Sequence, residues 1–256
     1  MRAGAGDARS TERLLLFGAS GAIGGAILGA AAARGWQVTA VSRHGAPELQ
    51  SEPTPDAQAT VRWIAADPLE ASFSPDMLTA ETPYTSVCWA QGANLNDSIY
   101  DVNVESHLAI YNANCTYILL TLQALLRAEL LQCGSGRGAR LCVISSIWQE
   151  LARQNKLSYC MSKAALRGLV LSAAADLAKD GHLINAVLPG ALDTPMTRRN
   201  LSAEQIERLE GATQFGTLPQ LGDVASLVCY LCSAENTGIT GQFIAADLGY
   251  SRVRIV

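Results

Sequence analysis

Charged side chains are scarce in this sequence, and no stretch of it is strongly basic or apolar over a long run. Asp, Glu, Lys and Arg make up only 16% of the 256 residues, and the formal net charge is −4, so nothing resembles the basic surface that binds nucleic acid. The apolar run 119–131 is broken by Thr, Gln, Arg and Glu, and no uninterrupted run is long enough to span a bilayer. We therefore expect a protein that binds neither nucleic acid nor a membrane.

Residues 1–12 lack the apolar segment of a signal peptide, and we interpret them as the flexible tail of a cytoplasmic protein. The seven Cys are scattered through apolar stretches, which suits buried, reduced thiols better than a disulfide framework. The pair Cys229-x-x-Cys232 could serve redox or metal chemistry, but it lies in an apolar helical run without a second pair of ligands. Core packing is the simpler interpretation, and we predict no metal site.

Short apolar runs alternate with segments of helical period from one end of the chain to the other. The predicted strands are 13–17, 36–42, 61–66, 85–90, 140–144, 183–188 and 242–246. The main predicted helices are an Ala-rich helix ending at residue 34, a long helix within 94–131, and helices over 158–179, 196–209 and 222–232. This alternation predicts an α/β fold, a single Rossmann-type domain over 13–256 whose doubly wound parallel sheet carries helices on both faces.

Tyr159 and Lys163 are four residues apart in a predicted helix, so both side chains lie on one face of it. An ammonium beside a phenol favours the phenolate and lowers the pKa of the Tyr, which makes the pair a candidate acid/base device. The same spacing occurs by chance on many helices, with a surface Lys and a half-buried Tyr. The pair alone leaves both interpretations open.

The segment 18–25, Gly-Ala-Ser-Gly-Ala-Ile-Gly-Gly, joins the first predicted strand to the Ala-rich helix. Such a turn presents backbone N–H groups and a helix N-terminus, which together bind the diphosphate of a dinucleotide. The glycine spacing is looser than in the G-x-G-x-x-G fingerprint, and a tight strand-to-helix turn would use glycines as well. The position between a strand and a helix near the N-terminus favours dinucleotide binding.

The second predicted strand ends at Ser42 and Arg43, where a dinucleotide fold meets the adenosine ribose. An acidic residue there would bind the 2′-hydroxyl of NAD, whereas a guanidinium suits the 2′-phosphate of NADP. The sequence has no acid at this point, so we predict NADP(H) rather than NAD(H). The alternatives are that Arg43 is a solvated loop charge, or that His44 shares or replaces its role.

With these elements in place, the chain resembles a short-chain dehydrogenase/reductase from about residue 13 to residue 249. The active-site Ser of that family precedes the Tyr by about a dozen residues, which selects Ser146, 13 residues before Tyr159, over Ser145. The family also has an Asn in the long helix before the fifth strand. Asn114 lies at the right distance, and Asn103 lies about three turns too early. The resemblance implies the catalytic set Asn114, Ser146, Tyr159 and Lys163.

The resemblance also implies what each of these residues does. Tyr159 is the acid in carbonyl reduction and the base in alcohol oxidation, while a hydride passes between nicotinamide and carbon. Ser146 donates a hydrogen bond to the carbonyl oxygen, where negative charge develops. Lys163 lowers the pKa of Tyr159 and holds the nicotinamide ribose, and Asn114 holds a water that returns protons from solvent.

The family's cofactor lies along the carboxyl edge of the sheet. The residues that the resemblance assigns to its binding are Gly18, Ser20, Gly21, Ile23, Gly24, Ser42, Arg43, Asp67, Ala90, Gly92, Pro189, Gly190, Leu192 and Thr194, together with Tyr159 and Lys163. Among them, Asp67 is expected at the adenine and Thr194 near the nicotinamide carboxamide.

The sequence departs from the family pattern in three places. Phe17 replaces the Thr of the glycine motif, which normally hydrogen-bonds toward an Asn-Asn-Ala-Gly turn, and that turn is changed to Trp-Ala-Gln-Gly at 89–92. Because the two changes fall on partners, we expect aromatic packing between Phe17 and Trp89 to compensate. Ala22 replaces a glycine, with Gly21 one residue earlier, as in longer, extended family members. Asp-Leu-Gly at 247–249 replaces the frequent Asp-Gly-Gly.

The loop 148–157 and the segment 196–215 follow the fifth and sixth strands, so we expect them to form the substrate pocket. Their apolar side chains, which suit a mostly apolar ketone, are Trp148, Leu151, Met196 and Phe215. Arg198 and Arg199 either attract an anionic acyl carrier or form a solvated helix face.

The chain is similar in layout to 3-oxoacyl-acyl-carrier-protein reductases, which implies a ketoreductase acting on a small-molecule or acyl-carrier carbonyl substrate. The resemblance also implies a homodimer or homotetramer formed through the family's fourth and fifth helices, which correspond here to the predicted helices within 94–131 and over 158–179. The rival function is a non-catalytic protein of the same fold that binds or senses a dinucleotide. Phe17 and the altered 89–92 turn motivate this rival, and the intact catalytic set opposes it.

Overall fold

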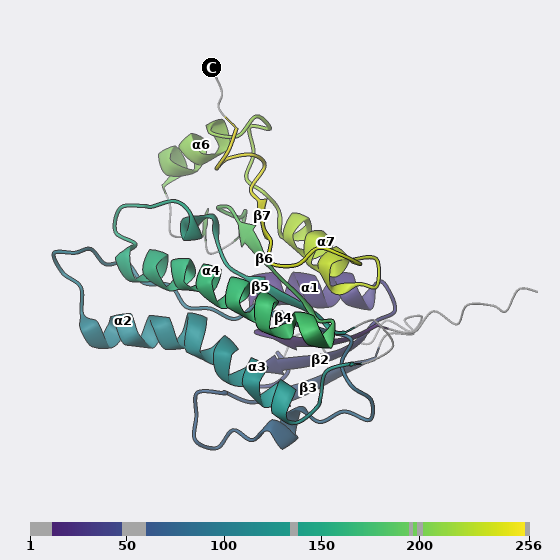
Figure 1. Cartoon of the computed structure of the whole chain (residues 1–256). Helices are drawn as coiled ribbons and strands as arrows, with labels where there is room; N and C mark the ends of the chain where they lie inside the picture. Colours follow the sequence, from purple (N-terminus) through teal and green to yellow (C-terminus); the bar gives the residue numbers. More distant parts are fainter. Residues whose placement is uncertain (1–11, 48–59, 134–137, 195–196, 199–201, 254–256) are drawn as a thin grey trace, which may run out of the picture.

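In the computed structural model, seven parallel strands form one sheet in the order β3-β2-β1-β4-β5-β6-β7 (Figure 1). The structure describes residues 12–47, 60–133, 138–194, 197–198 and 202–253. The strands are β1 (Arg13–Phe17), β2 (Gln37–Ser42), β3 (Val61–Ala65), β4 (Ser86–Trp89), β5 (Arg140–Ile144), β6 (Leu183–Pro189) and β7 (Phe243–Ala246). The predicted α/β fold is confirmed, and each bound of the seven predicted strands lies within one residue of its observed position.

Helices cover both faces of this sheet (Figure 1). One layer consists of α1 (Ala22–Ala32) and α7 (Leu221–Cys232), and the other of α2 (Val104–Tyr111), α3 (Tyr117–Arg127) and α4 (Leu157–Leu177). The short helix α6 (Ala203–Gly211) lies apart from the sheet, at the same end as the C-terminal segment (Figure 1). Short 3₁₀ turns occur at Pro75–Leu78, Ile147–Gln149 and Ala178–Asp180. Within the described ranges, no helix has both the length and the apolar character needed to cross a membrane.

The central strand β1 explains why the sheet needs both layers. Every residue of Leu14–Phe17 is fully buried, as expected for a parallel strand that is covered on both sides. Leu14 and Leu16 pack with residues of α1 and α7, whereas Leu15 and Phe17 pack with residues of α3 and α4. The alternation of a strand therefore divides the core into two clusters, one on each face.

The predicted long helix within 94–131 is wrong at its start and in its middle. Residues 94–103 form a loop, and α2 begins at Val104 because the Asn103 side chain caps it, accepting a hydrogen bond from the Ser106 N–H at 2.8 Å. Asn103 is thus an N-cap rather than a position within a helix. The helix is then interrupted by a π-helical turn at Asn112–Thr116, before α3. Such turns are rare and often mark functional sites.

Four of the cysteines pack together between the sheet and α7. Cys88 and Cys142 are paired in register on β4 and β5, and Cys229 and Cys232 face them from α7. All four are buried, which confirms the core-packing interpretation, and burial raises the pKa of the Cys88 thiol. Over the described part of the chain, no three metal-ligating side chains are grouped to hold an ion. The expectation of buried thiols is wrong for Cys133, which is exposed.

Glu12, which we assigned to the tail, is instead tied to the fold. Its carbonyl accepts a hydrogen bond from Gln37 N at 2.9 Å, and its carboxylate accepts from the Thr85 hydroxyl at 2.7 Å and from Ala234 N at 2.8 Å. The rest of the predicted tail lies outside the described residues.

Candidate active site

The turns that follow β1, β4 and β5 meet at the carboxyl edge of the sheet. A Cβ added at Gly18, after β1, would lie 2.4 Å from the backbone nitrogen of Gln91, after β4. A Cβ at Gly92 would lie 3.1 Å from Asn114 Oδ1 and 3.7 Å from Lys163 Nζ. Residues far apart in the sequence are therefore brought into one site, in the place where ligands bind to open α/β sheets.

Tyr159 and Lys163 lie one turn apart on α4, facing this edge. Lys163 is only 4% exposed, and its Nζ donates a hydrogen bond to the carbonyl of Ile144, the last residue of β5, at 3.0 Å. The same Nζ lies 5.7 Å from the centroid of the half-buried Tyr159 ring. The ammonium is thus fixed beside the phenol by the end of a strand.

Burial moves the pKa values of both groups, and for Tyr159 in the direction opposite to the one expected. Burial lowers the pKa of Lys163 to about 8, so the side chain is still mostly charged at neutral pH. Burial also raises the pKa of Tyr159, and a hydrogen bond with Ser146 opposes this rise. The net shift is therefore opposite to the predicted one, Lys163 is not among its causes, and the effect of Lys163 on the Tyr159 phenolate stays a prediction. Ser146 is the side chain that lowers this pKa.

The structure separates the two adjacent serines after β5. Ser146 is 6% exposed and hydrogen-bonds with Tyr159, and its oxygen also accepts from Trp148 N at 3.3 Å. The Ser145 hydroxyl instead donates to Gln149 Oε1 at 2.8 Å. Ser146 is thus the serine that lies beside Tyr159, as the spacing selected.

Asn114 lies in the π-helical turn and is 1% exposed. Its amide nitrogen donates to Ser162 Oγ at 2.9 Å and to the carbonyl of Ala93 at 3.1 Å, and its Oδ1 accepts from Ala93 N at 2.8 Å. Asn114 therefore joins the loop after β4 to α4, next to Lys163. These bonds engage both hydrogens of the amide nitrogen, and Oδ1 keeps one further acceptor position for a water.

A second network, which sequence reasoning missed, holds the start of α4. Asp97 is 6% exposed, and its carboxylate accepts hydrogen bonds from the backbone N–H of Ser158, at 3.0 Å, and from the Ser158 hydroxyl. His107 Nδ1 lies 2.9 Å from the same hydroxyl. Asp97 thus acts as an N-cap supplied by a distant loop, favoured by the positive end of the helix dipole. No local sequence signal marks such a cap, because its partners are 61 residues apart.

The turn after β1 has the shape that a diphosphate requires. Gly18 has a φ of +73°, and a Cβ at Gly24 would lie 2.1 Å from the Gly18 carbonyl, so neither position tolerates a side chain. Gly21 and Ala22 have no such crowding, which explains why Ala is tolerated at 22. The N-terminus of α1 has no side-chain cap and no acidic residue in its first turn. Its backbone N–H groups, beside exposed Ser20 and Gly21, are therefore free to bind an anion.

Arg43 and Asp67 lie at the ends of β2 and β3. Arg43 is exposed, and both its charge and that of half-buried Asp67 act on the Tyr117 phenol. Burial and Asp67 raise the pKa of Tyr117, and Arg43 opposes this rise. The Ser42 hydroxyl donates to the Gly45 carbonyl at 2.6 Å, which shapes the turn that carries Arg43. The Arg43 guanidinium is therefore accessible to solvent beside the glycine turn that follows β1.

The segment after β6 completes the edge. A Cβ at Gly190 would lie 2.9 Å from the Cβ of Asp247, so the strand exits of β6 and β7 pack against each other. Pro189 is the last residue of β6, and Leu192 is buried two residues after Gly190. Thr194 is 9% exposed, and its hydroxyl accepts from Thr197 N at 3.1 Å.

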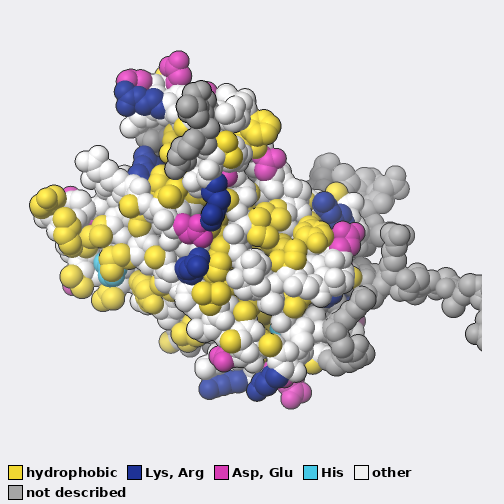
Figure 2. Space-filling view, turned by 45° about the horizontal axis from the view of Figure 1, so that its top comes forward, with side chains coloured by type: hydrophobic (Ala, Val, Ile, Leu, Met, Phe, Trp, Pro, Cys, Tyr) yellow, Lys and Arg dark blue, Asp and Glu magenta, His cyan; other side chains and the backbone are white. Residues whose placement is uncertain are grey.

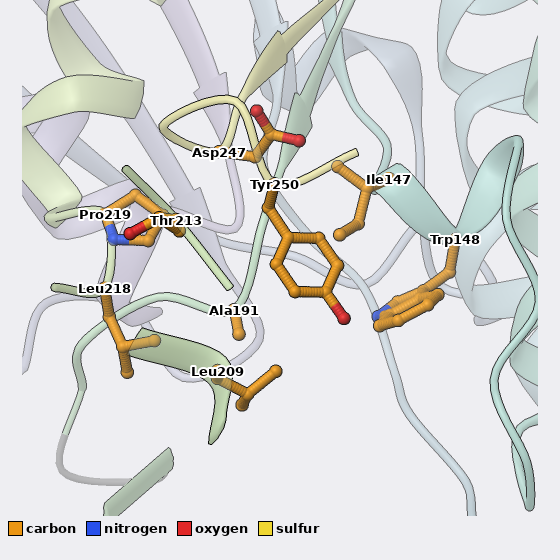
Figure 3. Close-up of a pocket in the computed structure, with 9 residues that line it drawn as sticks. All are labelled: Ile147, Trp148, Ala191, Leu209, Thr213, Leu218, Pro219, Asp247 and Tyr250. Atoms are coloured by element: carbon orange, nitrogen blue, oxygen red, sulfur yellow. The ribbon is translucent and has the colours of Figure 1, made fainter. Parts of the chain in front are cut away.

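A small cavity lies between Ile147 and Trp148, which follow Ser146 in the chain, and Leu209 of α6 (Figure 3). Its apolar lining consists of Ile147, Ala191, Leu209, Leu218 and Pro219, and its other lining residues are Trp148, Thr213, Asp247 and Tyr250. The cavity volume of about 10 Å³ is room for about one water molecule. None of the nine residues of α6, all of them described, is buried. A substrate larger than water therefore needs the α6 wall to move outward.

A cavity lies between the two segments predicted to form the substrate pocket, and only some of the side chains predicted for the pocket line it. Trp148 lines the cavity, but Leu151 packs against the core and Phe215 is 69% exposed. Arg198 donates to the Asp193 carboxylate through two hydrogen bonds of 2.6 and 2.8 Å on the surface, which matches the alternative of a solvated charge. This ion pair lowers the pKa of Asp193. Met196 and Arg199 lie outside the described residues. Tyr250 was missed, although its position just after β7 places it at the same edge.

A comparison with known protein families identifies the family to which this chain belongs. A family model described as Enoyl-(Acyl carrier protein) reductase matches residues 18–251, which is most of the chain. The chain belongs to the short-chain dehydrogenase/reductase family. It is therefore an oxidoreductase of that family, and the resemblance inferred from the sequence is confirmed.

Relatives within the short-chain dehydrogenase/reductase family cover the whole fold. The chain is 28% identical over 246 residues to the uncharacterized oxidoreductase YmfI of Bacillus subtilis, covering 92% of this chain and 97% of that protein. It is 27% identical over 238 residues to the 3-oxoacyl-[acyl-carrier-protein] reductase FabG of Escherichia coli, covering 92% and 95%. A solved gluconate 5-dehydrogenase from Burkholderia cenocepacia, in complex with NADP and tartrate, shares the fold with a TM-score of 0.81, 21% identity and coverage of 96% and 97%.

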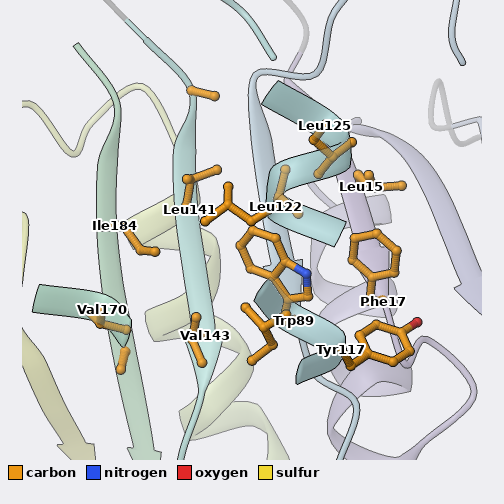
Figure 4. Close-up of a cluster of buried hydrophobic side chains, with 14 of the residues drawn as sticks. Leu15, Phe17, Trp89, Tyr117, Leu122, Leu125, Leu141, Val143, Val170 and Ile184 are labelled. Atoms are coloured by element: carbon orange, nitrogen blue, oxygen red, sulfur yellow. The ribbon is translucent and has the colours of Figure 1, made fainter. Parts of the chain in front are cut away.

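The departure of this short-chain dehydrogenase/reductase at Phe17 and Trp89 is compensated as expected. The two rings are stacked with centroids 6.0 Å apart and planes 7° apart, and Tyr117 meets Phe17 edge-on at 5.7 Å (Figure 4). The Trp89 indole N–H donates to the Thr121 hydroxyl at 2.8 Å. An aromatic cluster thus replaces the polar link that the family uses between β1 and the turn after β4.

Proposed function

We propose that this protein is an NADP(H)-dependent ketoreductase that transfers a hydride between nicotinamide and a ketone or secondary alcohol. The observation that carries the proposal is the convergence of Ser146, Tyr159, Lys163 and Asn114 beside the glycine turn at one edge of the sheet. The residues present fit a dinucleotide, because Gly18 and Gly24 let the turn close tightly before the uncapped N-terminus of α1, which lies beside exposed Ser20 and Gly21. When bound, the nicotinamide supplies the hydride that becomes the new C–H bond of the alcohol.

The side chains of the site would then handle the proton and the charge. Ser146 donates a hydrogen bond to the carbonyl oxygen, on which negative charge grows as the hydride arrives. Tyr159 donates its proton to that oxygen, and burial keeps the phenol protonated at neutral pH, as the acid role in carbonyl reduction requires. Lys163 stabilises the resulting phenolate. A water held at Asn114 would return the proton from solvent.

The proposed preference for NADP rests on Arg43. Its exposed guanidinium follows β2, and no acidic side chain stands at this point to bind a ribose hydroxyl. The similar gluconate 5-dehydrogenase structure contains NADP, which supports the same choice for this fold.

Replacing Arg43 by Ala is expected to raise the Kd for NADPH about tenfold or more, because a charge-assisted bond to the 2′-phosphate is lost. The Kd for NADH should change less than about twofold. Titration by nucleotide fluorescence measures both constants, and His44→Ala is the matched control. A loss confined to His44→Ala would transfer the role to His44, and a wild-type preference for NADH would refute the NADP proposal.

The substrate is proposed to be an uncharged ketone or an acyl group with a mostly apolar chain. The cavity beside Ser146 has an apolar majority in its lining, and the FabG relative is named for a 3-oxoacyl substrate on a carrier protein. The test is the oxidation of NADPH by the purified protein with a panel of ketones and 3-oxoacyl thioesters. Turnover with at least one of them supports the proposal. NADPH binding without any turnover would favour the rival, a non-catalytic dinucleotide sensor, which the aromatic replacement at Phe17 and Trp89 motivates.

A homodimer or homotetramer is proposed through the outer surfaces of α2, α3 and α4. Large apolar side chains are exposed there, including Val104 at 66%, Leu108 at 52% and Leu119 at 57%. Figure 2 shows hydrophobic side chains gathered at the end of the molecule where α2 lies. An exposed apolar surface of this kind is typical of a protein interface.

A further inference from the structure

Some polar side-chain atoms that line the cavity beside Ser146 already have hydrogen-bond partners within the protein, and others do not. The Thr213 hydroxyl donates to the carbonyl of Glu210 or Thr217, each 3.0 Å away. The Asp247 carboxylate accepts from Gly249 N at 3.0 Å and from Ser251 N at 2.9 Å. These two side chains are therefore satisfied by their own loops.

Two other polar atoms of the lining, Trp148 Nε1 and Tyr250 Oη, have no hydrogen-bond partner among the described residues. Figure 3 shows the Tyr250 phenol directed toward the Trp148 indole across the cavity. Both side chains are half-buried, so each atom is reachable by a ligand. Indole offers only a donor and phenol offers a donor, so the pair suits an acceptor oxygen.

The position of this pair relates it to the reacting carbonyl. Trp148 is two residues after Ser146 and donates its backbone N–H to the Ser146 oxygen at 3.3 Å. The Trp148 side chain therefore extends from the same turn that carries Ser146, so a carbonyl bound to Ser146 would lie beside the wall of the cavity that holds this indole. The remaining lining near the pair, which includes Ile147, Ala191 and Leu209, is apolar.

The charged side chains near the cavity indicate whether the substituent of the ketone is anionic or uncharged. Asp247 is the charged side chain among the lining residues, and it would repel a carboxylate. Arg198, the described one of the two arginines predicted for the pocket, is already paired with Asp193. Among the described residues that line it, the cavity thus offers hydrogen-bond donors to an anionic substrate but no cation.

We propose that Trp148 and Tyr250 are specificity-determining residues that select uncharged ketones carrying a second acceptor oxygen, such as an ester, thioester or amide carbonyl, near the reacting carbonyl. This inference rests on the proposed ketoreductase function and refines it. A ketone without the second oxygen leaves both donors unpaired in a largely apolar space, which costs binding free energy. A free 3-oxo acid meets the Asp247 carboxylate.

The test compares ethyl 3-oxobutanoate with 2-hexanone, a ketone that has no second carbonyl, and with the free acid 3-oxobutanoate. For wild type, kcat/KM should follow the order ester, ketone, acid. In Tyr250→Phe the ratio of kcat/KM for ester over ketone should fall about fivefold to tenfold, mainly through KM, because one neutral hydrogen bond is lost. Trp148→Phe should lower the same ratio, and Tyr230→Phe, which changes an exposed phenol on α7, should leave it unchanged.

The outcomes separate this inference from the function on which it rests. An unchanged ratio in both variants would overturn the inference, and an equal loss on ester and ketone would show a merely structural role. Binding of the alcohol ethyl 3-hydroxybutanoate, measured by calorimetry on the full chain, needs no turnover. Weaker binding to Tyr250→Phe than to wild type supports the inference even if no ketone is reduced, and equal binding contradicts it.

Discussion

Replacing Tyr159 by Phe is expected to lower kcat for ketone reduction by about 100-fold to 10,000-fold, because the proton donor is removed while the ring remains. Tyr159 is the phenol that lies beside both Ser146 and Lys163, so the substitution removes the proposed proton donor from the site. The Kd for NADPH should stay within about threefold, since the phenol adds at most one hydrogen bond to the cofactor.

Stopped-flow or steady-state absorbance of NADPH measures the turnover, and fluorescence titration measures the binding. Tyr100→Phe is a matched control, because Tyr100 is 96% exposed on the loop before α2. Turnover of Tyr159→Phe within tenfold of wild type would mean that another group donates the proton. Loss of NADPH binding in this variant would instead point to a damaged fold.

Replacing Trp89 by Ala is expected to reduce the free energy of unfolding by about 3–5 kcal/mol, the cost of emptying a large buried aromatic site. Trp89 is fully buried, stacks on Phe17 and donates its indole N–H to Thr121 on α3. It therefore links β4 to β1 and to the helical layer at the same time. Urea unfolding followed by circular dichroism, at one fixed protein concentration, gives the change.

Trp89→Phe separates the ring from the N–H group. It keeps an aromatic ring on Phe17 and loses the bond to Thr121, so a smaller loss of about 1–2 kcal/mol is expected. A loss below about 1 kcal/mol in Trp89→Ala would contradict the view that the aromatic cluster replaces the family's polar link.

The sheet was predictable because parallel strands that are buried on both faces leave short, almost wholly apolar runs. Leu14–Phe17 is such a run, and its limits are marked by the glycine that follows. The positions of Ser146 and Asn114 were predictable only through the family spacing, since nothing local distinguishes them from Ser145 and Asn103. The structure places them beside Tyr159 and Lys163, and their catalytic roles stay proposals.

What the sequence could not predict depends on contacts between distant segments. Asp97 caps α4 from a loop 61 residues away, and the π turn at Asn114 interrupts a helix whose residues have ordinary helical preferences. The pKa of Tyr159 was predicted in the wrong direction because four-residue spacing shows which charges are near but not how deeply the phenol is buried. Tyr250 was missed because it enters the cavity from a turn with Leu248 and Gly249 at positive φ.

The proposed reaction at this site moves a hydride from NADPH to a carbonyl carbon. The direct test uses NADPH deuterated at C4 of the nicotinamide, on the face that gives up its hydrogen, with ethyl 3-oxobutanoate as the substrate. Mass spectrometry should find one deuterium on the carbinol carbon of the product with wild type and almost none with Tyr159→Phe. Bound NADPH without deuterium in any alcohol, across the ketone panel and with either C4 label, would contradict the account and leave a dinucleotide-binding protein in its place.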